Sequence, residues 1–202
     1  MKKTCDYLAD IVPSIEELYG KEKCTEIMND AQLRYNELLE ENKDDSKKVR
    51  MHTYDRIYPA VAMFDALTNN GVEREEAADL LVEYYHQRSE PVGEMIRKIM
   101  KVPGLYKIIP SLFTKLTNVM FGEDSGFKAR YYPTGKNQMK VDMVKCPYTD
   151  LCKKYGCPEI VRGFCEADDI CYGHMHEKLI WGRTKTLGKG GDCCDFDIRI
   201  KE

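Results

Sequence analysis

The sequence lacks the features that mark nucleic-acid-binding and membrane-spanning proteins. Its 202 residues carry a formal net charge of −3, and basic residues are not interleaved with aromatic ones, so we expect no nucleic-acid partner. Residues 1–12 contain two lysines but no apolar run behind them, which argues against a signal peptide or a membrane span at this end. We therefore expect a cytoplasmic protein, in which cysteines serve as thiols, metal ligands or catalytic groups rather than in disulfides.

The sequence also lacks the cysteine spacings of common metal sites. There are nine cysteines but no Cys-x-x-Cys pair, and the intervals from Cys146 to Cys171 match no zinc-finger or ferredoxin pattern. The stretch 189–192 precedes a strand pattern rather than a helix, so we expect a hairpin turn there and not a phosphate-binding loop. Most of the thiols nonetheless gather near the C-terminus, at Cys146, Cys152, Cys157, Cys165, Cys171, Cys193 and Cys194. Thiols this concentrated, with aspartates among them, indicate chemistry or metal ligation rather than packing alone.

Helical periodicity dominates the N-terminal part of the chain. Apolar residues recur at helical spacing in 13–42, 52–68 and 73–89. The segment 92–121 is apolar as well, but its two internal prolines, Pro103 and Pro110, are expected to divide it into short helices.

Basic residues are interleaved through this segment, at Arg97, Lys98, Lys101, Lys107 and Lys115. Three interpretations remain open for 92–121. It is a set of helices over a core, a basic amphipathic surface for a membrane or a partner, or a mobile lid over an active site.

Strand patterns begin at Phe127. The expected strands are 127–132, 137–146, 179–187 and 194–200, and the expected helices between them are 148–155 and 158–172. This order favours an α+β fold, with a helical N-terminal half packed on a small C-terminal antiparallel sheet that has cysteine-bearing helices inserted. We expect a helical region, 1–122, and a cysteine-rich region, 123–202, that form one integrated domain.

The residues that carry chemistry are centred on the helix 158–172. Cys165 and Asp168 are three residues apart and so share one face of this helix. A thiol beside a carboxylate is either a nucleophile with its base or a pair of ligands for one metal. Cys146 ends a strand and Cys194 begins the last one, so the strand ends and the helix can bring these cysteines to Cys165. The three thiols are the candidate metal ligands, with zinc as the candidate ion.

Arg183 is expected on the strand 179–187. Its guanidinium can clamp a substrate carboxylate in a bidentate way. The alternative is a structural salt bridge with Asp195 or Asp197. The candidate substrate-binding or supporting residues are Cys146, Thr184, Thr186, Cys194 and Asp195.

Several short motifs occur together in the C-terminal region. They are Lys145-Cys146-Pro147-Tyr148, Gly156-Cys157-Pro158-Glu159, Phe164-Cys165-x-x-Asp168, Arg183-Thr184-x-Thr186-Leu187, and Gly191 leading to Cys194-Asp195-Phe196. With the helical N-terminal half, they make most of the chain resemble the L-2-amino-thiazoline-4-carboxylic acid hydrolase family. A looser similarity, through the final glycine and Cys-x-Phe strand, links it to vinyl-reductase-type small-molecule-binding domains.

The resemblance implies a hydrolase that opens a small cyclic isothiourea to an N-carbamoyl amino acid. In the mechanism that follows from it, Asp168 holds the protonated ring nitrogen or activates water, and Arg183 binds the substrate carboxylate. Cys165 attacks the ring carbon or acts as a metal ligand, while Cys146 and Cys194 support it.

Two other classes of function remain open. One is a non-catalytic small-molecule-binding module, and the other is a metal-holding or redox protein, for which bound zinc or iron would be diagnostic. The hydrolase interpretation requires a small-molecule substrate and no cofactor. It leaves homo-oligomerisation open.

Overall fold

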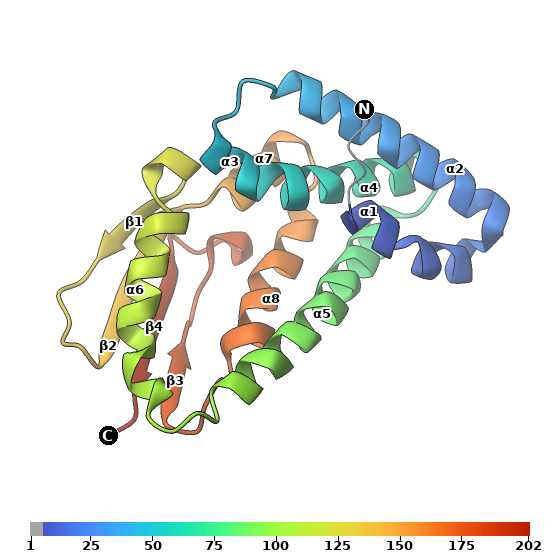
Figure 1. Cartoon of the computed structure of the whole chain (residues 1–202). Helices are drawn as coiled ribbons and strands as arrows, with labels where there is room; N and C mark the ends of the chain where they lie inside the picture. Colours follow the sequence, from blue (N-terminus) through green and yellow to red (C-terminus); the bar gives the residue numbers. More distant parts are fainter. Residues whose placement is uncertain (1–5) are drawn as a thin grey trace. The chain divides into compact units, whose positions relative to one another are not determined.

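The computed structural model describes residues 6–202 and has the α+β architecture that the sequence predicts (Figure 1). The α-helices are α1 (Asp6–Asp10), α2 (Val12–Glu41), α3 (Lys47–His52), α4 (Tyr58–Asn69), α5 (Arg74–Ile99), α6 (Ile109–Met120), α7 (Pro147–Lys154) and α8 (Val161–Tyr172). The short helical turns are η1 (Thr53–Ile57), η2 (Leu105–Ile108), η3 (Glu123–Ser125), η4 (Pro158–Ile160) and η5 (Leu187–Lys189). The strands are β1 (Lys128–Tyr131), β2 (Gln138–Lys145), β3 (Leu179–Gly182) and β4 (Cys194–Ile200).

The chain packs as two compact units. Unit 1 contains the chain up to Tyr84 together with Leu151–Ile160, and unit 2 contains Tyr85–Asp150 and Val161–Glu202. The expected regions, 1–122 and 123–202, stay a prediction. Helix α6 and the second half of α5 belong with the sheet because their apolar inner faces join its core.

Unit 1 is held together by the packing of α2 and α4. The sequence of α4 is apolar almost throughout, and Pro59 in its first turn fits there because that position needs no backbone donor. Helix α2 is kinked at Gly20, whose φ of 78° is left-handed and is readily adopted only by glycine. Tyr58 in α4 donates a hydrogen bond of 2.9 Å to Asp45, which fixes α4 to the loop after α2.

Unit 2 is built on a four-stranded antiparallel sheet in the order β1-β2-β4-β3. Along β2, Met139, Val141 and Met143 are buried, so these alternate residues face the core. Helix α6 packs on β2 and β4, and its inner side joins the same core as Val141 and Ile198. The sheet therefore carries a helical layer that closes its apolar face.

Two predicted elements differ from the structure. The helical pattern 73–89 predicts a helix that ends at residue 89, but α5 continues through Pro91 to Ile99. Pro91 is exposed, whereas Ser89 and Gly93 on either side are buried, so the helical packing continues past the proline. The predicted strand 179–187 ends at Gly182, and its second half is an irregular segment followed by η5.

Within residues 6–202, no helix is both long enough and apolar enough to cross a membrane.

Candidate functional site

Helix α8 carries the central residues of the candidate site, and α5 fixes its position within unit 2. A Cβ at Gly93 of α5 would lie 2.8 Å from the carbonyl oxygen of Ile170, so glycine permits the close approach of the two helices. The rings of Tyr85 and Phe164 pack with centroids 4.5 Å apart. A hydrogen bond of 2.9 Å between His86 and Glu166 adds a polar contact between α5 and α8.

Arg183 follows directly after β3 and binds α8 through its guanidinium. Its Nη2 donates to the carbonyl oxygen of Cys165 at 2.7 Å and also to Asp169, and its Nη1 lies 3.4 Å from Asp168. The side chain is only 3% exposed. Arg183 therefore forms a structural ion pair, as the alternative prediction states. Its partners are Asp168 and Asp169, not the predicted Asp195 or Asp197. Arg183 also lies in a loop rather than on the predicted strand.

Aromatic rings surround this ion-pair cluster. The guanidinium carbon of Arg183 lies 5.4 Å from the ring centroid of Phe196 and 5.9 Å from that of Trp181. The indole of Trp181 donates a hydrogen bond of 2.8 Å to Asp169. Asp169 thus accepts from both Arg183 and Trp181, and the single tryptophan of the chain reports on this cluster.

The Cys165 thiol faces the turn η5. Burial raises the pKa of this thiol, and the nearby Asp168 carboxylate raises it further. Arg183 and a hydrogen bond with Thr186 act to lower the pKa, but the net pKa is raised. Thr186 is not on a strand as predicted, because its hydroxyl caps η5 and accepts from the backbone N–H of Lys189 at 3.2 Å. A Cβ at Gly188 would lie 3.1 Å from the Cys165 sulfur and 2.7 Å from Val161, so η5 packs directly on α8. The thiol is therefore neutral at neutral pH, in a setting that offers a hydroxyl and a positive charge to the thiolate.

Cys146 and Cys194 lie close enough to Cys165 to interact with it electrostatically, as their positions at two strand ends predicted. Cys146 stands just before α7, where backbone N–H groups of Thr149 and Tyr148 bind its sulfur; burial still raises the pKa to about 12. Cys194 begins β4 as predicted. Its sulfur accepts from the backbone N–H of Leu187 at 3.2 Å, and burial raises its pKa to about 11. Both belong with an apolar cluster around Phe127, in which Cys194 is buried and Cys146 half-buried; their supporting role stays a prediction.

Asp195 organises the irregular segment that follows β3. It accepts hydrogen bonds from the backbone N–H groups of Thr184 and Lys185, at 2.9 and 2.8 Å, and from the Thr184 hydroxyl. Desolvation acts to raise the pKa of Asp195, but the hydrogen bonds from Thr184 and Lys185 outweigh it and the net pKa is lowered. The carboxylate takes the N–H groups that a longer β3 would use, which is why the predicted strand 179–187 ends early.

The described chain, 6–202, contains no group of three or more His, Cys, Asp or Glu side chains arranged to hold a metal ion. The proposed ligand set of Cys146, Cys165 and Cys194 therefore gains no geometric support, and zinc stays a prediction. Of the remaining cysteines near the C-terminus, Cys152 and Cys157 belong to unit 1 and lie outside this cluster. The others are the buried Cys193 and also Cys171, whose thiol bonds the carbonyl of Ser89 at 3.7 Å.

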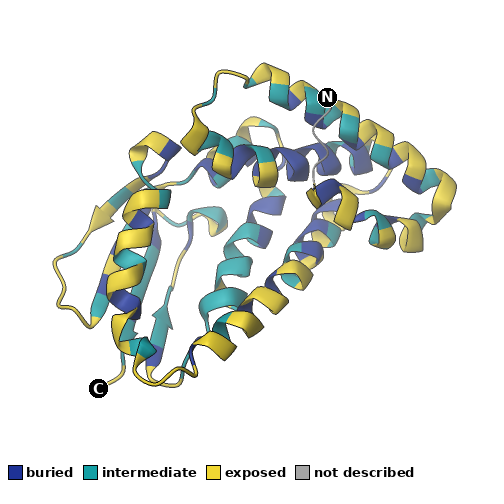
Figure 2. Cartoon of the chain, in the orientation of Figure 1, coloured by how far each residue is buried: buried dark blue, intermediate teal, exposed yellow. Residues whose placement is uncertain are grey.

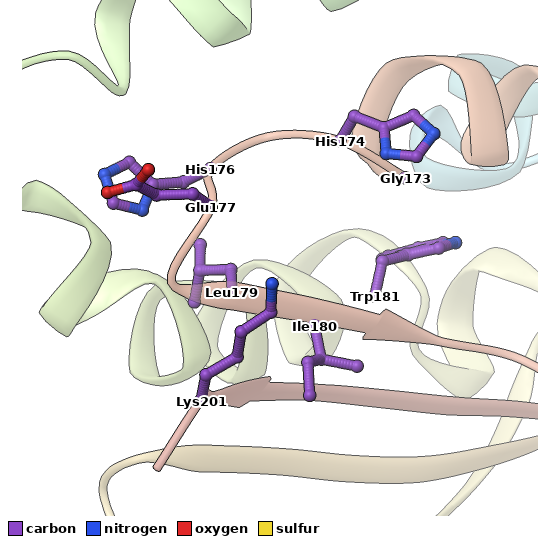
Figure 3. A pocket seen from close by; sticks show the side chains of 8 residues that line it. All are labelled: Gly173, His174, His176, Glu177, Leu179, Ile180, Trp181 and Lys201. Atoms are coloured by element: carbon purple, nitrogen blue, oxygen red, sulfur yellow. The ribbon is translucent and has the colours of Figure 1, made fainter.

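A cavity of about 330 Å³ lies in unit 2 at the C-terminal end of α8 (Figure 3). Its lining includes His174, His176, Glu177, Trp181 and Lys201. It touches the cluster only through Trp181, and Cys165, Asp168 and Arg183 do not line it. This cavity is therefore a neighbour of the candidate site and not the site itself.

Sequence reasoning missed Asp169 and Gly188. No motif in the sequence singles out Asp169, yet it is the carboxylate that joins Arg183 to Trp181. Gly188 has no role in any sequence motif, although a Cβ at this position would lie 3.1 Å from the Cys165 sulfur. The run of glycines at 188, 190 and 191 was the signal for such a close approach.

The family model for L-2-amino-thiazoline-4-carboxylic acid hydrolase matches residues 50–198, which include every residue of the thiol and ion-pair clusters described above. The chain belongs to this family. No curated protein matches it.

Proposed function

We propose that this chain hydrolyses L-2-amino-thiazoline-4-carboxylate, or a closely related cyclic isothiourea, to the N-carbamoyl amino acid. The observation that carries the proposal is the family match over residues 50–198. The geometry around Cys165 supports it, because a thiol, a carboxylate and a hydroxyl meet where η5 packs on α8.

The ring carbon between sulfur and nitrogen is the electrophile once the ring is protonated. Asp168, one turn after Cys165 on α8, removes the thiol proton, and the Cys165 sulfur attacks that carbon. The ring C–S bond breaks, and the departing sulfur takes the proton from Asp168. Water then adds to the same carbon, the bond to Cys165 breaks, and the N-carbamoyl product leaves as the thiol is restored.

The surroundings of Cys165 keep the resting thiol protonated but stabilise the thiolate once it forms during the reaction. Burial keeps the resting thiol protonated, whereas Arg183 and the Thr186 hydroxyl act to lower its pKa. A thiolate formed by proton transfer to Asp168 meets both groups already in place. We assign Thr186 to stabilising the attacking sulfur.

We assign Arg183 to positioning rather than to binding the substrate carboxylate. Its buried guanidinium already donates to the Cys165 carbonyl and to two carboxylates. Lys189 in η5 directly follows Gly188, and its ammonium lies 3.8 Å from Glu166 with the side chain 62% exposed, so it is our candidate for the substrate carboxylate.

The test is product formation by the purified chain at catalytic concentration. The cyclic substrate is added in large excess, and N-carbamoyl-L-cysteine is quantified by mass spectrometry. Many product molecules per chain are expected from the wild type and from Cys171→Ala, a control thiol on the same helix. Cys165→Ser and Asp168→Asn are expected to lose at least a hundredfold in kcat. If the folded wild type showed no turnover, the proposal would be overturned. Full activity in Cys165→Ser would overturn its covalent step.

Lys189→Ala tests the binding assignment separately. We expect KM to rise with little change in kcat, since a carboxylate contact binds ground state and transition state alike. Lys185→Ala is the matched control, because Lys185 lies in the same segment but pairs with Asp192, whereas Lys189 pairs with Glu166 of α8. An unchanged KM in Lys189→Ala would reject Lys189 as the carboxylate-binding residue.

A further inference from the structure

Unit 2 exposes two rows of large apolar side chains at the end of α5 and along α6. The first row is Met95, Ile99 and Val102, and the second is Ile108, Leu112, Leu116 and Val119. Their exposed fractions range from 40% at Leu112 to 66% at Val119. Figure 2 shows exposed positions along both stretches. We call these seven residues, with the basic residues between them, the apolar–basic face.

Helix α6 is apolar on two sides. Ile109 and Phe113 pack into the core with Met100, which follows α5, so the inner side of α6 is already covered by the core. Leu112, Leu116 and Val119 recur at spacings of four and three and form a second, outward stripe. A surface helix ordinarily places charged or polar residues there, so a second apolar stripe indicates a surface that another phase or molecule covers.

The charge on this face selects the class of partner. No Asp or Glu occurs between residues 95 and 122, whereas the same stretch holds Arg97, Lys98, Lys101, Lys107 and Lys115. The chain as a whole is acidic, with a net charge of −3. Among the described residues, Lys101, Lys107 and Lys115 form no ion pair, so their charge is available to an anionic surface. Two copies meeting through this face about a two-fold axis would place lysines against lysines, which disfavours self-association.

A small cavity lies at the turn between α5 and α6. It has a volume of about 320 Å³ and is lined by Lys101, Lys107 and Lys178, with Glu177 as its one carboxylate. The rings of Tyr106 and His176 stack in its wall, 4.8 Å apart and 11° from parallel. Three ammonium groups around one opening suit a phosphate or carboxylate headgroup.

We propose that the apolar–basic face binds the surface of an anionic lipid bilayer. The apolar rows enter the headgroup–acyl boundary while the lysine stems extend along it and keep their charges among the lipid phosphates. The cavity at Lys101, Lys107 and Lys178 receives one headgroup. The binding is peripheral, and it is independent of the proposed hydrolase activity.

The test is flotation of the full chain with two kinds of vesicle. One is pure phosphatidylcholine and the other contains roughly 30% phosphatidylserine, whose charge attracts nearby lysines. We expect the chain to float with the anionic vesicles only, and to be released as the salt concentration rises. Equal binding to both vesicles, or binding to neither, would overturn the proposal.

Matched variants identify the surface responsible. Leu116→Glu with Val119→Glu is expected to abolish flotation. Lys107→Gln with Lys115→Gln is expected to lower the partition coefficient about 25-fold, because each lysine near an anionic surface raises that coefficient roughly fivefold. The control is Leu18→Glu with Leu33→Glu, two leucines of α2 that are each 61% exposed. This face would be rejected as a membrane surface if the α6 variants bound vesicles like the wild type, or if the control variant lost binding equally. It would also be rejected if the wild type were a dimer that the α6 variants dissociate. Circular dichroism verifies that every variant is folded.

Discussion

Arg183 joins the segment after β3 to the backbone of Cys165 through a hydrogen bond of 2.7 Å to its carbonyl oxygen. The same guanidinium reaches Asp168, one turn further along α8, at 3.4 Å. A single buried fork therefore fixes both the candidate nucleophile and its candidate base. Lysine, a point charge without the planar fork, cannot make the same set of contacts.

Arg183→Lys is expected to weaken both stability and turnover. We expect the free energy of unfolding to fall by about 1–2 kcal/mol, since hydrogen bonds to charged groups are lost while the two aspartates stay partly solvated. Denaturant unfolding followed by Trp181 fluorescence measures this loss at the site. Arg199→Lys is the control, because Arg199 pairs with Asp197 on the same strand with its side chain 43% exposed. Equal stability of the two variants would contradict the role given to Arg183.

Asp195→Asn should reveal a pH-dependent contribution to stability. Because the folded-state pKa of Asp195 lies below its ordinary value of 3.8, its carboxylate stabilises the fold above that pH, and this stabilisation is lost as the pH falls through the lowered pKa. The free energy of unfolding of the wild type should therefore exceed that of the variant by about 1 kcal/mol near neutral pH. The difference should shrink below about pH 4.

Denaturant titrations at several pH values measure this difference. Asp44→Asn, in the exposed loop after α2, is the control and should follow the wild type throughout. A difference between wild type and Asp195→Asn that stays constant down to the acid limit would contradict the assignment.

The thiols of Cys146 and Cys194 should resist alkylation in the folded protein. Burial raises the pKa to about 12 for Cys146 and to about 11 for Cys194, so very little of either thiol is the reactive thiolate near pH 8. Iodoacetamide labelling followed by peptide mass spectrometry should show both labelled far more slowly than in denatured chain. Native labelling of Cys146 at the denatured rate would contradict the raised pKa of its thiol.

The parts of the site that follow from local periodicity were predictable from the sequence. Cys165 and Asp168 share a face of α8 because they are three residues apart, and Cys146 and Cys194 meet near them because each adjoins a strand end. The antiparallel sheet also followed from the order of the strand and helix patterns along the chain.

The parts that depend on tertiary contacts were not predictable in this way. The stretch 179–187 reads as one strand, but the Asp195 side chain binds the N–H groups of Thr184 and Lys185 and ends β3 early. Arg183 consequently leaves the sheet and reaches Asp169, a partner that strand alternation does not indicate. Likewise, helical spacing predicts a helix end at residue 89, yet α5 continues through Pro91 to Ile99, with buried residues on either side of the proline.

Gly188→Ala should displace the turn that supports Cys165. The added Cβ would lie 2.7 Å from a methyl group of Val161 and 3.1 Å from the Cys165 sulfur, so either η5 or α8 must shift. Because Val161 is fully buried and cannot move aside freely, we expect a loss of stability of about 1–3 kcal/mol.

The shift should also separate Thr186 from the thiol, which would raise the pKa of Cys165 further and reduce turnover more than tenfold. The control is Gly135→Ala, since a Cβ there meets nothing within 4 Å and its φ is not in the left-handed region. Denaturant unfolding and the product assay on both variants give the answer. If Gly188→Ala keeps wild-type stability and turnover, the contact between η5 and α8 does not position the thiol, and Thr186 loses its proposed role with it.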